Sequence, residues 1–128
     1  MSTDRHAKGS EVRRQVLGDA HVDRSEEGRT ELNAPFLDLV TEGAWGTVWA
    51  SDALSHRERS MITLALLAGL GNWQEFELHL RATKRTGASQ KDITQVLMHV
   101  AIYAGVPRAN HAFSLAKRVL SEGEGPAE

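Results

Sequence analysis

The chain has 128 residues, of which 41% are hydrophobic, enough apolar surface for one compact core and too little for two. Its 15 Lys and Arg residues against 17 Asp and Glu residues give a formal net charge of −2, so no bulk attraction to nucleic acid or anionic membranes is expected. The chain has no cysteine, which excludes disulfides, thiolate metal sites and thiol peroxidase chemistry. No apolar run reaches membrane-spanning length and residues 1–14 are polar, so we expect a cytoplasmic protein without a signal peptide.

The first part of the chain predicts little regular structure. Residues 10–17 form a short amphipathic run that Gly18 stops, and residues 23–33 are polar enough to predict a loop. The residues before this run and the tail 121–128 are expected to be frayed ends.

A longer helix is expected over residues 35–49. Asn33 is a favourable N-cap residue, and Pro35 suits the first turn of a helix. Gly43 and Gly46 weaken the interior of this helix by roughly 1 kcal/mol each relative to alanine, unless they let another backbone approach closely.

The second half of the chain predicts helices with clear ends. A capping box at residues 55–58 (Ser-His-Arg-Glu) precedes a strongly apolar run, and Ser89 with Asp92 forms a second cap. Gly87 is a typical residue for a helix C-terminus, and Pro107 for a first turn. The expected helices cover residues 61–70, 73–86, 89 to the break at Gly105, and 107–120.

The predicted fold class is therefore all-α, with no segment that alternates with a period of two residues. We expect a single domain over residues 1–128 of about six helices, with an ordered core at about 10–120. The apolar helix 61–70 and the many small residues favour burial against a second subunit, so a homo-oligomer is expected.

The helix over residues 73–86 carries the candidate catalytic pair. At about 100° per residue, Glu75 and His79 lie one turn apart between two apolar flanks, on the side predicted to be buried. One interpretation is a Glu–His hydrogen bond that satisfies two core polar groups. The other is that Glu75 orients His79 and favours its protonated form, which then donates a proton.

The other histidines and the tryptophans allow several interpretations. A metal site would need a third ligand from His21, His99 or His111, but a Glu and a His four residues apart do not by themselves indicate a metal. His21 lies at a predicted break between helices, where functional residues often occur. Trp45 and Trp49 are four residues apart, which favours core packing first and a pocket wall second.

Several segments, in order from about residue 12 to residue 120, resemble the γ-carboxymuconolactone decarboxylases. Together these segments are specific for that family, although each one alone is a weak indication. They are Leu-Gly-Asp-Ala-His-Val-Asp at 17–23, Ala-Trp-Gly-Thr-Val-Trp at 44–49, Arg-Ser-Met-Ile-Thr-Leu-Ala-Leu-Leu-Ala at 59–68, Glu-Phe-Glu-Leu-His at 75–79 and Ala-Ile-Tyr-Ala-Gly-Val-Pro at 101–107.

The resemblance implies an all-helical fold similar to the alkylhydroperoxidase-D-like proteins, usually a hexamer or trimer of dimers. Thiol members of that superfamily carry Cys-x-x-Cys-x-x-x-His, where this chain has Asn72, Glu75 and His79. The redox chemistry is thus lost and the histidine remains. The implied reaction is cofactor-free loss of CO₂ from 4-carboxymuconolactone, a small lactone dicarboxylate, giving the β-ketoadipate enol-lactone in protocatechuate breakdown.

This reaction needs a proton donor, an oxyanion donor and cationic anchors. His79 suits protonation or oxyanion stabilisation, with Glu75 orienting it. The first choice of anchor for the substrate carboxylates is Arg59, which starts the buried helix, and the second is Arg57. Arg81 is not preferred, because it lies on the solvent face of its helix. The remaining candidate substrate-binding residues are His21, Trp45, Trp49 and Tyr103. The alternative function is a non-catalytic helical oligomer or binding module that keeps the fold.

Overall fold

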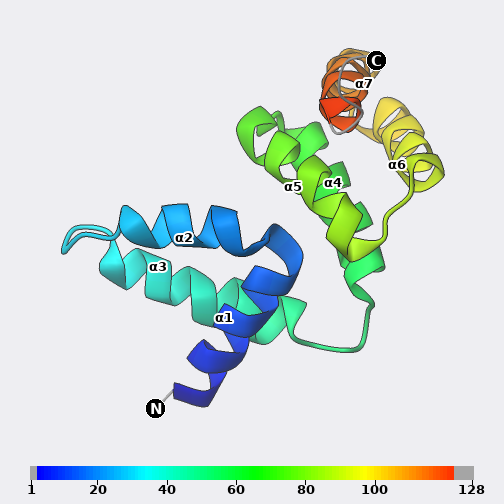
Figure 1. Cartoon of the computed structure of the whole chain (residues 1–128). Coiled ribbons are helices and arrows are strands. Elements are labelled where there is room, and N and C mark those ends of the chain that lie inside the picture. The colour runs from blue at the N-terminus through cyan, green and yellow to red at the C-terminus, as the bar shows by residue number, and fades with distance from the viewer. Residues whose placement is uncertain (1–2, 123–128) are drawn as a thin grey trace, which may run out of the picture. The chain divides into compact units, whose positions relative to one another are not determined.

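A computed structural model describes residues 3–122 of the chain, all of whose regular structure is helical (Figure 1). The predicted all-α class is confirmed, and no strand occurs within residues 3–122. Backbone contacts divide the chain into two compact units, one ending at His56 and the other beginning at Arg57. The elements are α1 (Thr3–Leu17), α2 (Asp19–Glu27), α3 (Ala34–Val40), the π-helical η1 (Thr41–Trp49), α4 (His56–Leu70), α5 (Trp73–Thr86), α6 (Gln90–Tyr103) and α7 (Val106–Leu120).

In the N-terminal unit, α1 lies directly against η1. A Cβ atom on Gly9 would overlap the backbone of Thr41 and Gly46, and a Cβ atom on Gly46 would overlap the backbone of Arg5. The expectation that a glycine here admits another backbone is confirmed at Gly46. It is wrong at Gly43, where no atom outside its own helix lies within 4 Å.

Two predictions for the start of the chain are wrong. Helix α1 begins at Thr3 and not near residue 10, and α2 replaces the first part of the predicted loop. The cause is a buried arginine: Arg13 donates to Glu26 Oε2 at 3.1 Å and to Ser25 Oγ at 2.8 Å. This tertiary contact outweighs the weak helix propensity of a polar segment. The last predicted tail residues, 123–128, lie outside the described part of the chain.

The helix expected over residues 35–49 is present as α3 followed by η1. Its N-cap prediction is only partly right. Asn33 occupies the N-cap position, but its side chain makes no capping bond and instead accepts a hydrogen bond from the Thr30 backbone N–H at 2.7 Å. The helix type changes to π in the segment that meets α1, which is where the close contact at Gly46 occurs.

The C-terminal unit, the green-to-red helices of Figure 1, is built from α4, α5, α6 and α7 around one apolar core. Each helix contributes one stripe of buried apolar side chains, spaced three or four residues apart, as burial of a single helix face requires. Small side chains on α7 let it lie close to its neighbours. The buried residues of this core are Leu64, Ala68, Phe76, Leu80, Ile93, Val96, Leu97, Val100, Ala109, Ala112, Ala116 and Val119.

The ends predicted at Gly87, at the Ser89–Asp92 cap and at Pro107 are confirmed, whereas α4 begins at His56 and not at residue 61. Gly87 closes α5 in the left-handed conformation, with φ of 88°. Ser89 and Asp92 form the reciprocal capping box of α6: the Ser89 Oγ accepts from the Asp92 N–H at 3.0 Å, and the Asp92 carboxylate accepts from the Ser89 N–H at 2.9 Å. Within residues 3–122, no helix is long and apolar enough to cross a membrane.

The capping box of α6 gives a stability prediction. Ser89→Ala removes the acceptor for the Asp92 N–H, so we expect the free energy of unfolding to fall by about 1 kcal/mol. Urea denaturation followed by circular dichroism measures this change. Gln90→Ala, an exposed neighbour outside the box, is the control, and an equal loss in both variants would contradict the capping role of Ser89.

Candidate active site

His79 is a buried polar side chain on α5. It is 8% exposed, and its ring atom Nδ1 is shielded from solvent. Its helix neighbours Phe76 and Leu80 are 0% exposed and belong to the apolar core. An imidazole at the margin of such a core has little water around it, which strengthens any electrostatic interaction it makes with a bound molecule. The predicted burial of His79 is confirmed.

Glu75 does not share this burial. The expectation that the whole Glu75–His79 pair is buried is wrong for the single chain, because Glu75 is exposed. The physical reason is its place in the first turn of α5, where Gln74 is exposed as well. A carboxylate there interacts favourably with the positive end of the helix dipole. The spacing of one helical turn between Glu75 and His79 is unchanged by this correction.

Arg57 is already paired with a carboxylate. Its Nε donates to Asp92 Oδ2 at 2.8 Å and its Nη2 donates to Asp92 Oδ1 at 2.6 Å, which is a bidentate pair. The guanidinium group, together with the Ser89 backbone N–H, holds the pKa of the Asp92 carboxyl well below its usual range. This pair fixes the start of α4 to the capping box of α6, so Arg57 has a structural task.

Arg59 lies in the first turn of α4 and is half-buried, with its Nε shielded from solvent. The next residue, Ser60, is 0% exposed. Its Oγ has no hydrogen-bond partner among the described residues. Ser60 lies four residues before Leu64 on the buried stripe of α4, so a polar atom interrupts an otherwise apolar face. Ser60 was not among the predicted site residues, although its position in that apolar stripe was a signal.

Tyr103 and His99 lie together near the end of α6. Their rings stack with centroids 5.1 Å apart and planes 22° apart. Tyr103 is 81% exposed, so it forms no wall within its own unit. No group of three His, Asp or Glu side chains able to hold a metal ion occurs within residues 3–122.

Three predicted site residues belong to the N-terminal unit. Trp45 and Trp49 are 6% and 7% exposed, with ring centroids 5.1 Å apart, and Trp49 meets His56 at 5.9 Å. This burial favours core packing within that unit. His21 is half-buried on α2 and not in a break between helices, because the break occurs at Gly18. The structure thus brings the Trp45 and Trp49 rings together in one unit, and in the other unit Glu75 and His79 lie one helical turn apart on α5.

Arg108 is a further cation, which was not among the predicted site residues. Its guanidinium lies over the bare Cα of Gly71, in the turn between α4 and α5, where a Cβ atom would overlap it. Gly71 has a positive φ of 76°. No carboxylate of residues 3–122 forms an ion pair or hydrogen bond with Arg108. The glycine between two predicted helices was the available signal for this contact.

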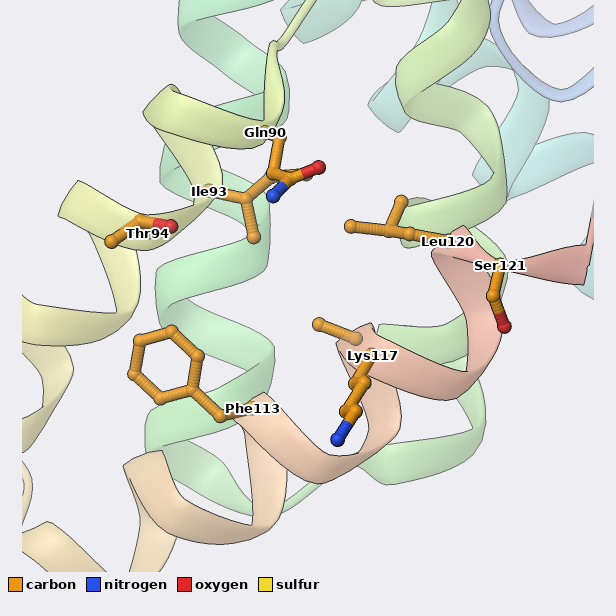
Figure 2. A pocket seen from close by; sticks show the side chains of 8 residues that line it. Gln90, Ile93, Thr94, Phe113, Lys117, Leu120 and Ser121 are labelled. Carbon is orange, nitrogen blue, oxygen red and sulfur yellow. The ribbon is translucent and has the colours of Figure 1, made fainter. Parts of the chain in front are cut away.

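A pocket of about 340 Å³ lies between α6 and α7 (Figure 2). Ile93, Phe113 and Leu120 supply apolar surface, and Lys117 lies at its edge. None of the predicted site residues lines it, and the same is true of a second pocket of about 280 Å³ beside Arg81. These pockets therefore do not identify the reaction site.

Comparison with known proteins supplies the family. The carboxymuconolactone decarboxylase family model matches residues 34–118. A 4-carboxymuconolactone decarboxylase of Acinetobacter baylyi is 36% identical over 118 residues, which cover 92% of this chain and 88% of that protein. Nitrosuccinic acid decarboxylase of Metarhizium robertsii is 33% identical over 90% of this chain and 80% of that protein. The family predicted from the sequence is confirmed: the chain belongs to the carboxymuconolactone decarboxylase family.

Proposed function

We propose that the protein is a cytoplasmic carboxy-lyase that converts 4-carboxymuconolactone to the β-ketoadipate enol-lactone and CO₂ without a cofactor, in protocatechuate breakdown. The observation that carries the proposal is a buried histidine, His79, on α5 of a chain that is similar to a 4-carboxymuconolactone decarboxylase over 118 residues. A decarboxylase needs a proton donor held out of bulk water, and His79 has that environment.

The reaction breaks the bond between the lactone γ-carbon and its carboxylate. CO₂ leaves, and the electron pair spreads through the unsaturated ring to the carbonyl oxygen as a dienolate. The protonated imidazole of His79 then donates its proton to the α-carbon, which completes the enol-lactone, and the imidazole takes a new proton from water. One proton is consumed for each CO₂ released.

The apolar surroundings of His79 assist the first step. A carboxylate loses its charge as it becomes CO₂, so an environment that solvates charge poorly favours the product side of that step. Phe76 and Leu80 supply such an environment on α5. The binding energy needed to bring the dianion there comes from groups that hold the rest of the molecule.

Arg59 is the preferred anchor for the carboxylate that the substrate keeps. It is half-buried in the first turn of α4, where an ion pair is less screened than at a fully exposed position. Arg57 is less available because both of its Asp92 contacts would have to break. Tyr103 is proposed as a wall residue and His21 as a further binding residue, whereas Trp45 and Trp49 are assigned to core packing of the N-terminal unit.

We also propose a homo-oligomer, a hexamer or trimer of dimers. Ile62, Leu66 and Leu70 form an exposed stripe on α4, with exposures of 49%, 58% and 68%, and Ile102 on α6 is 77% exposed. Contiguous apolar surface of this kind is typical of subunit interfaces. A second copy placed there would also cover Tyr103.

Nitrosuccinic acid is a second candidate substrate, because the relative named for it matches 90% of the chain. Like 4-carboxymuconolactone, nitrosuccinic acid carries two carboxyl groups. Its nitro group accepts the electron pair that CO₂ leaves behind. The same residues would serve in the same roles.

The test is a coupled ultraviolet assay with purified, chelator-treated protein and freshly made 4-carboxymuconolactone, following lactone loss and CO₂ release. Turnover supports the proposal. Turnover of nitrosuccinic acid alone would replace it with the second candidate, and no turnover of either by a folded oligomer would favour a non-catalytic module.

His79→Gln should lower kcat by roughly 100-fold or more, because glutamine cannot deliver a proton to carbon. The same assay measures this, with circular dichroism as a check of the fold. His6→Gln, which changes a histidine bonded to Asp38 in the N-terminal unit, is the control and should keep its activity. Near-normal turnover by His79→Gln would rule out the proton-donor role.

Glu75→Gln should move the pH–rate profile to lower pH, because the protonated imidazole of His79 loses a nearby negative charge. Glu77→Gln is the matched control, since Glu77 lies two residues further along α5 and pairs with Arg81 and Arg118 instead. A profile for Glu75→Gln that coincides with those of the control and the unchanged protein would contradict the pairing.

Arg59→Met should raise KM by about tenfold or more with a smaller effect on kcat, because it removes a contact made equally in the ground and transition states. Arg57→Met is the comparison and should chiefly lower stability, since its carboxylate partner is Asp92. A raised KM in Arg57→Met alone would transfer the anchor role to Arg57.

A further inference from the structure

We propose that Arg108 is a catalytic residue that donates hydrogen bonds to the lactone carbonyl oxygen while negative charge builds up on it. This inference rests on the proposed function and fills the one role in that mechanism that has no residue. The proton donor is His79 and the carboxylate anchor is Arg59, but the dienolate oxygen still needs a donor.

The first argument is that Arg108 is available. Of the arginines in the C-terminal unit, Arg57 is held by Asp92, and Arg81 and Arg118 are held by Glu77 and Glu122. Arg108 makes no ion pair with a described residue. A guanidinium group without a carboxylate partner keeps all five N–H donors for a bound oxyanion.

The second argument is that the fold holds Arg108 in place. The guanidinium lies over Gly71, whose lack of a side chain provides the space that the group occupies. One turn further along α7, the ring of His111 packs on Trp73 at the start of α5, with centroids 4.4 Å apart. These contacts join the first turns of α7 to the start of α5 and limit where the guanidinium can move.

The third argument is that Arg108 and His79 are both connected to α5. Gly71, over which the guanidinium lies, comes two residues before Trp73, the first residue of α5. His79 lies six positions after Trp73, which is a rise of roughly 9 Å along the helix axis. The reacting ring requires a donor at the α-carbon and another at the carbonyl oxygen next to it. In this proposal the substrate ring lies with its α-carbon at the imidazole of His79 and its carbonyl oxygen at the guanidinium of Arg108.

The chemistry explains why a guanidinium suits this position. The carbonyl oxygen is neutral in the substrate and carries the negative charge of the dienolate after CO₂ leaves. A fixed cation beside it therefore stabilises the transition state more than the substrate. Glu75 is exposed near the start of α5. In the proposed mechanism its carboxylate acts on the imidazole of His79 and not on the oxyanion.

The decisive variant is Arg108→Gln. We expect kcat to fall by about 100-fold or more with KM changed by less than about threefold, the pattern of an interaction made only in the transition state. Arg108→Lys keeps the charge without the planar fork and should recover part of the loss. Arg85→Gln, an exposed arginine in the last turn of α5, is the matched control and should behave like the unchanged protein.

A second readout separates dienolate stabilisation from CO₂ loss. Removal of an α-proton from the enol-lactone product gives the same dienolate, so the protein should catalyse exchange of that proton for deuterium in D₂O. Arg108→Gln should slow this exchange together with decarboxylation, whereas a merely structural role would lower only the melting temperature.

The two possible failures are distinct. Absence of turnover by the unchanged protein overturns the proposed function and the role of Arg108 with it. Turnover by the unchanged protein, with Arg108→Gln retaining kcat or changing only KM, overturns the role of Arg108 alone.

Discussion

The reversal of the chain at Gly71 is the constraint on which the C-terminal unit depends. The left-handed conformation of Gly71 ends α4, and its N–H and that of Asn72 satisfy the Ala68 and Leu67 carbonyl oxygens at 3.2 and 2.9 Å. The turn brings the apolar stripes of α4 and α5 into one core, and His79 is buried at the margin of that core. The same missing side chain leaves the space for Arg108. One glycine therefore serves both the packing and the proposed chemistry.

Charge pairing in this unit separates structural cations from cations available for binding. The Arg57–Asp92 pair and the cluster of Arg81 and Arg118 with Glu77 and Glu122 tie helices together. Arg57 keeps the pKa of Asp92 low, so the carboxylate that caps α6 stays ionised and accepts hydrogen bonds over the whole neutral range. A substrate carboxylate competes poorly for such paired arginines. Available cations are thus better candidates for the site.

The sequence predicted best what local chemistry determines. Gly87 ends α5, and Ser89 with Asp92 starts α6, because caps and left-handed turns depend on a few neighbouring residues. Predictions failed where distant residues decide. Helix α2 depends on a contact with Arg13. Glu75 is exposed although its angular position on α5 predicts burial, because helical periodicity says nothing about where a covering element ends. The Arg108 contact joins two helices and has no periodic signature.

Exclusion of water is the remaining requirement of the proposed reaction. Glu75 and Arg108 are exposed in the C-terminal unit, yet a dienolate is stabilised well only in surroundings of low dielectric constant. Helices α4 to α7 leave both side chains exposed, so the proposed reaction requires a covering surface, which the proposed homo-oligomer would provide. Helix α4 has apolar surface that another copy of the chain would bury: Ile62, Leu66 and Leu70 are 49%, 58% and 68% exposed. Burial of that surface would supply the free energy that closes the site, so assembly and catalysis would depend on the same contacts.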